Sequence, residues 1–160
     1  MEKDAALRKQ LIELLKGGQA HATFQEAVKD FPAELRGKRP QGAPHSPWEE
    51  LEHMRIAQWD ILEFSRDADH KSPKFPDGYW PKSPAPPSDK AWDKTVHDFL
   101  QDQKSFSALI ADDETDLYAR IPHGEGQTVL RQALLAADHN AYHLGQLVLL
   151  RRILGAWKEE

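Results

Sequence analysis

The chain contains no cysteine among its 160 residues, which excludes disulfides, thiolate metal sites and a cysteine nucleophile. Basic residues do not predominate, because 21 Lys and Arg stand against 26 Asp and Glu, so the basic stripe of a general nucleic-acid binder is missing. No uncharged apolar run approaches the roughly 18 residues of a membrane span. The N-terminal MEKDAALRKQ carries acids where a signal peptide has a basic and then an apolar region. We therefore expect a soluble, cytoplasmic protein without nucleic-acid or membrane partners, with residues 1–160 as a single domain.

Alternating runs of β-branched residues are also absent, so strands are not expected. Ten of the eleven prolines lie between Pro32 and Pro87. Because proline inside a helix removes a backbone donor and clashes with the preceding turn, long helices must lie in the proline-free windows. Those windows predict an all-α four-helix bundle, with helices over residues 3–16, 47–66, 88–111 and 128–154.

Local signals refine this prediction. Thr23 followed by Glu26 is a capping box and predicts a short extra helix after the first one. Residues 67–87 read DADHKSPKFPDGYWPKSPAPP, in which Phe75, Tyr79 and Trp80 stand among helix-breaking residues. A disordered linker rarely carries so many aromatics, so we expect an ordered strap packed on the bundle. A gating lid is the alternative, because long loops in compact domains are often functional.

The fourth expected helix is unusually poor in charge. From Gln132 to Leu150 its only formally charged residue is Asp138, whereas a surface helix of this length shows a charged face. We expect the bundle to cover most of this helix and a second subunit to cover the rest.

His139 and His143 lie four residues apart on this helix, on one face and about one turn from each other. Two core or surface histidines satisfied by hydrogen bonds would show the same spacing. Protonation of either of two adjacent imidazoles in apolar surroundings would nonetheless cost free energy. A shared divalent metal avoids this cost, because it binds the neutral form of both rings.

A metal needs a third ligand, and His53 is the best candidate because it borders the apolar face of its own helix. Asp60 follows seven residues later on the same stripe and could orient an imidazole or act as a base toward water; the alternative is a solvated carboxylate at the helix edge. His21, Gln146 and Tyr142 are candidate contacts beyond the direct ligands.

The pair of His139 and His143 is not the H-E-x-x-H motif, because Asn140 stands where the glutamate would be. Zn, Ni, Fe and Mn all accept imidazole, so ligand type does not choose among them.

These residues resemble the DinB-like superfamily of four-helix metalloproteins over nearly the whole chain. The resemblance is carried by SPWEELEHMRIAQWDILEFSRD at 46–67, by the FPDGYWP segment of the strap, and by ADHNAYHLGQLVLLRRILGAW at 137–157. It implies a divalent metal, most often nickel or zinc, held by His53, His139 and His143 with water in the remaining positions. It also implies a homodimer.

The resemblance does not name a substrate, since characterised relatives include thiol-dependent S-transferases, a thiol-using isomerase and proteins described as metal-dependent hydrolases. The leading hypothesis is a metal enzyme in which the metal activates a low-molecular-weight thiol or water for attack on an electrophilic small molecule. The second is a non-catalytic, stress-related protein that binds a metal or small ligand. The third is a structural helical dimer with incidental histidines.

Overall fold

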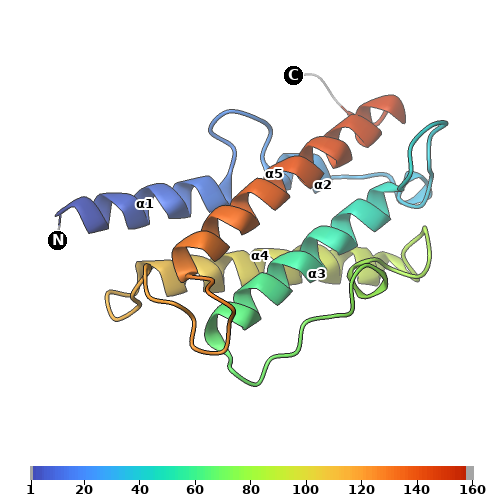
Figure 1. Cartoon of the computed structure of the whole chain (residues 1–160). Coiled ribbons are helices and arrows are strands. Elements are labelled where there is room, and N and C mark those ends of the chain that lie inside the picture. Colours follow the sequence, from blue (N-terminus) through green and yellow to red (C-terminus); the bar gives the residue numbers. More distant parts are fainter. Residues whose placement is uncertain (1, 158–160) are drawn as a thin grey trace.

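Five α-helices make up most of residues 2–157, the part of the chain that the computed structural model describes (Figure 1). No strand is present within these residues, so the all-α prediction is confirmed. None of the helices in this part of the chain is both long and apolar enough to cross a bilayer. The helices are α1 (Glu2–Lys16), α2 (Phe24–Val28), α3 (Pro47–Arg66), α4 (Asp89–Ala111) and α5 (Val129–Ile153).

Each of the last four helices begins at a side-chain cap. The Oγ1 of Thr23 and the Oγ of Ser46 accept hydrogen bonds from the backbone N–H groups three residues ahead, and both belong to full capping boxes. Ser88 and Thr128 cap α4 and α5 in the same way. Beyond the end of α5, Gly155 has a φ of 71°, a left-handed conformation that glycine adopts at little cost. Local sequence chemistry therefore accounts for the helix boundaries.

Helix α3 lies at the centre of the packing, against α4 on one side and α5 on the other, while α1 packs on α4 and α5 (Figure 1). The apolar core has two parts along the bundle. One is built around Leu62, Phe106 and Ile110, and the other around Met54, Phe99 and Leu147, all of which are fully buried or nearly so. The facing surfaces of α3 and α5 carry the candidate site residues described below.

A series of buried hydrogen bonds between side chains and backbone determines how α3, α4 and α5 pack together. Asn140 on α5 donates its Nδ2–H to Gln58 Oε1 on α3 at 2.8 Å, and Gln58 donates to the Phe99 carbonyl on α4 at 2.7 Å. Buried amides must be paired to offset their lost hydration, so these contacts favour one alignment of the three helices. Asn140 directly follows His139, and that alignment therefore positions the histidine.

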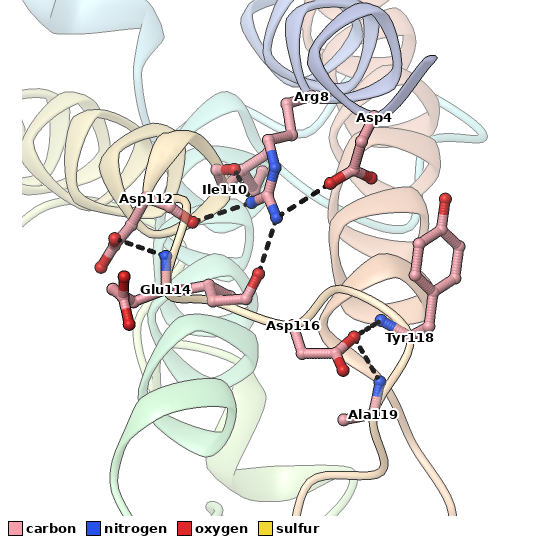
Figure 2. A network of polar contacts seen from close by, with 9 residues as sticks. Asp4, Arg8, Ile110, Asp112, Glu114, Asp116, Tyr118 and Ala119 are labelled. Atoms are coloured by element: carbon pink, nitrogen blue, oxygen red, sulfur yellow. Dashed lines mark hydrogen bonds and ion pairs between the residues drawn. The ribbon is translucent and has the colours of Figure 1, made fainter. Parts of the chain in front are cut away.

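A second buried group ties α1 to the loop that leads into α5. Arg8 is only 8% exposed and donates to the carbonyls of Ile110, Asp112 and Thr115 at 2.7, 2.9 and 2.8 Å. Figure 2 shows the Arg8 guanidinium reaching from α1 to the end of α4, with Asp116 of the same loop accepting the N–H groups of Tyr118 and Ala119. The loop is thereby held against α1, which fixes where α5 begins.

The strap, residues 67–87, runs back from the end of α3 toward its beginning and contains a short 3-10 turn, η2 (Asp77–Tyr79) (Figure 1). Tyr79 and Trp80 are partly buried, whereas Phe75 is 79% exposed. The aromatic side chains of the strap thus differ, with Tyr79 and Trp80 turned to the bundle and Phe75 to solvent. Trp80 and the backbone of Tyr79 lie against the histidine cluster.

Candidate metal centre

His53, His139 and His143 come together between α3 and α5, although His53 and His139 are 86 residues apart in the chain. The Nε2 atom of His53 lies 3.0 Å from that of His139 and 3.2 Å from that of His143. The ligand atoms of all three lie within 4.8 Å of one another. The structure therefore brings together the three residues that the sequence pattern singles out.

The other ring nitrogens of two of these histidines have defined partners. His53 Nδ1 lies 2.8 Å from the backbone carbonyl oxygen of Tyr79, and His143 Nδ1 lies 2.7 Å from Glu50 Oε2. A carbonyl and an ionised carboxylate only accept, so each Nδ1 carries the proton. When both rings are in their neutral form, the Nε2 atoms of His53 and His143 present lone pairs to each other.

The close contact between these two Nε2 atoms allows us to test whether the site fits a metal. A proton on His139 Nε2 would satisfy its contact with His53, but it would leave the 3.2 Å contact between His53 and His143 without a hydrogen. A cation among the three nitrogens satisfies all of them together. Zn–N bonds of about 2.0–2.1 Å at tetrahedral angles place ligand nitrogens about 3.3–3.4 Å apart, close to the distances found. The donor set and its spacing fit a divalent metal.

Electrostatics also favour neutral ligands. Burial, and then the neighbouring His143 and His53, lowers the pKa of His139 to about 3. Burial likewise lowers the pKa of His53, and the partial charge of the Tyr79 carbonyl opposes the shift without reversing it. Neutral imidazole is the form that binds a metal, so these rings are held ready as ligands at neutral pH.

Trp80 of the strap covers one side of the site. Its ring stacks on His53 with centroids 3.9 Å apart and nearly parallel planes, and His45 stacks on its other face at 3.9 Å. This sandwich fixes the plane of the His53 ring and keeps solvent from that face.

Asp60, the candidate base, lies away from the histidine ring atoms. Its Oδ2 accepts from the Tyr79 hydroxyl at 2.6 Å and its Oδ1 lies 2.8 Å from His70 Nε2. It therefore reaches His53 indirectly, through Tyr79, whose hydroxyl binds Asp60 and whose carbonyl binds His53.

The three other candidate contacts lie at different distances from the site. Tyr142 is next to it, edge-on to His143 with ring centroids 4.9 Å apart, and is 64% exposed. His21 lines a small pocket on another side of α5, with Ala141 and Leu144. Among the hydrogen bonds of residues 2–157, none joins His21 or Gln146 to the three histidines. Their roles as contacts beyond the ligands stay predictions.

Glu50 is the functional residue that sequence reasoning missed. It is 4% exposed and lies one turn before His53 on α3, from where it reaches His143. A carboxylate that accepts the Nδ1–H of a metal-binding histidine fixes its tautomer and raises its basicity. The signal available in the sequence was the spacing of Glu50 and His53, which places an acid on the same helix face as the expected ligand.

Comparison with known proteins agrees with this geometry. The model of one protein family, described as the DinB superfamily, matches residues 18–147, a stretch that includes all three histidines. No curated protein and no solved structure matches the chain. With more than half of the chain matched and a three-histidine group between two helices of a helical bundle, this protein belongs to the DinB superfamily.

Proposed function

We propose that this protein is a metal-dependent enzyme in which His53, His139 and His143 hold a divalent ion and a small cellular thiol attacks an electrophilic small molecule. The observation that carries the proposal is the convergence of three imidazoles on one point. Nickel or zinc is the proposed metal, with iron or manganese as alternatives that imidazole also accepts. A cytoplasmic location is part of the proposal, because small thiols are kept reduced there.

A metal held by only three protein ligands keeps an open position, and when bound it lowers the pKa of a thiol or water so that a nucleophile exists at neutral pH. The chain has no cysteine, so the sulfur comes from the cosubstrate. In the reaction, a bond forms between this sulfur and an electrophilic carbon. The bond from that carbon to its leaving group breaks, the leaving group takes the electron pair, and the thiol proton passes to solvent.

The carboxylates around the site favour a thiol over water. Glu50 accepts from His143, and both oxygens of Asp60 are occupied by Tyr79 and His70. Asp60 is held by its contacts with the strap, and Glu50 is engaged with His143 through Oε2. A thiol has a pKa near 8.5, against about 15.7 for water, so it needs less help from a base. Hydrolysis is therefore the alternative reaction.

Within a single copy, the three ligand histidines differ in exposure on the side of the site at Tyr142. His53 is buried, whereas His139 and His143 are only partly buried and lie beside this exposed tyrosine. Trp80 covers the opposite approach by stacking on His53. The side at Tyr142 is open in a single copy, and the homodimer proposed below would place the partner subunit over it.

The test is turnover by untagged protein loaded separately with Zn, Ni, Mn or Fe. An activated aryl halide or an epoxide serves as the electrophile, with cysteine or glutathione as thiol, and a chromogenic ester is assayed without thiol. We expect thiol consumption that needs both metal and protein and that is lost in His143→Ala. Ester cleavage without thiol would favour the hydrolase. Metal binding without either reaction would overturn the enzyme and favour a non-catalytic metal-binding protein.

We also propose a homodimer formed through α5. One stripe of this helix is solvent-exposed within a single copy, and its large apolar members are Leu134, Tyr142, Leu149 and Ile153. In an antiparallel pair of α5 helices related by a two-fold axis at Gly145, Asp138 of one copy faces Arg152 of the other. Both charged residues are exposed, and glycine at the axis allows close approach. Such self-complementarity is what a two-fold interface requires.

Sedimentation analysis checks this interface. We expect the parent chain to be dimeric and Leu149→Glu to be monomeric, because the substitution buries two charges near the axis of the pair. The matched control is Leu14→Glu, since Leu14 is 54% exposed but lies on α1. A monomeric parent, or a dimer that survives Leu149→Glu and dissociates with Leu14→Glu, would refute an α5 interface.

A further inference from the structure

The strap is joined to the bundle at a few points, and these converge on the metal ligand His53. Most strap residues are exposed. The contacts that anchor it include the pairing of His70 and Tyr79 with Asp60, the stack of Trp80 on His53 and the bond from Ser46 to the Pro84 carbonyl. The first two groups of contacts lie on the α3 face that carries His53.

Tyr79 connects the strap to the ligand by two bonds. Its hydroxyl donates to Asp60 Oδ2 at 2.6 Å, and its backbone carbonyl accepts from His53 Nδ1 at 2.8 Å. A carbonyl cannot donate, so the docked strap selects the tautomer whose proton is on Nδ1 and whose lone pair is on Nε2. That lone pair faces His139 and His143.

Asp60 is the fixed end of this chain of contacts. It is 8% exposed, and its two oxygens accept from two strap residues. Burial and the Asp60 carboxylate raise the pKa of Tyr79 to about 12, so the hydroxyl stays protonated and remains a donor. A buried carboxylate that loses these donors is left without compensation for its lost hydration, which favours the docked strap.

We propose that Asp60 and Tyr79 are positioning residues for His53, and that docking of the strap and metal binding stabilise each other. This inference rests on the three-histidine metal site of the proposed function. The docked strap presents His53 in its metal-binding form. By reciprocity, a metal on Nε2 strengthens the Nδ1–H bond to the Tyr79 carbonyl and so holds the strap down.

The experiment uses Asp60→Asn and Tyr79→Phe, with Asp77→Asn as the matched control. Asp77 is an exposed strap residue two positions before Tyr79, so its change removes the same charge without touching the anchor. Affinity for Zn is measured by competition with a chelating indicator, and absorption of the Co-loaded protein reports ligand geometry. Trypsin cleavage at the exposed Lys71, Lys74 and Lys82 reports strap docking, and circular dichroism checks folding.

We expect both anchor variants to stay helical, to bind Zn about 10–100-fold more weakly and to show altered Co absorption. Metal should slow strap cleavage in the parent and the control, and much less in the anchor variants. A parent that binds no metal would overturn the metal site itself and this inference with it. A parent that binds metal, with unchanged affinity and equal metal protection in the anchor variants, would overturn the coupling alone.

Discussion

We expect His53→Ala and His143→Ala each to abolish near-stoichiometric metal binding, and this is the largest effect that we predict. Each substitution leaves two imidazoles at a site where, in the parent, His53 Nε2 lies 3.0 Å from the Nε2 of His139 and 3.2 Å from that of His143. Two neutral ligands hold a divalent ion poorly, so the loss should exceed the roughly 10–100-fold typical when a residue that only orients a ligand is changed. The measurement is metal content by inductively coupled plasma mass spectrometry on untagged protein.

The control for this experiment is His97→Ala, because His97 is an exposed histidine on α4. It removes one imidazole from the chain but none from the site, so metal content should equal that of the parent. Helical content by circular dichroism separates lost binding from lost folding. A parent that stays metal-free after incubation with Zn, Ni, Mn and Fe would refute the metal site. So would full metal content in both site variants.

The second large effect that we expect is a loss of stability of the metal-free protein as the pH falls. In the unfolded chain the pKa of His139 is near 6.5, and in the folded protein burial and the neighbouring histidines lower it to about 3. Between these values the unfolded state binds a proton that the folded state does not. The free energy of unfolding therefore falls as the pH drops from 6.5 toward 3, by at most about 1.4 kcal/mol per pH unit for this group. The lowered pKa of His53 acts in the same direction.

Urea unfolding in the presence of a chelator, from about pH 7 down to about pH 5, measures this dependence. The comparison is His139→Gln, which keeps a polar side chain that does not titrate. We expect the parent to lose stability more steeply than the variant over this range, and added Zn at pH 7 to raise the stability of the parent only. Parallel profiles for the two proteins would show that His139 titrates as it does in water.

The boundaries of the helices could be predicted from sequence because their causes are local. The capping boxes at Thr23 and Ser46, the prolines and Gly155 act on neighbouring backbone groups, so the information lies within a few residues of each boundary. The spacing of His139 and His143 is local in the same sense, since one helical turn places them on one face. His53 was identified with them from its place on its own helix and from the family resemblance.

Only the tertiary structure decided what surrounds those histidines. Glu50 meets His143 across 93 residues of chain, and that contact depends on the alignment of α3 with α5. The acceptor for His53 is a backbone carbonyl, which every residue has, so no residue type marks Tyr79 for that role. Asp60 could be placed on the right stripe by periodicity. Its engagement by the strap depended on how residues 67–87 return along α3. Sequence by itself determined the helices and singled out the three histidines, because helical geometry and imidazole chemistry are local. The fold decided the partners of these histidines, because those contacts join segments that only packing brings together.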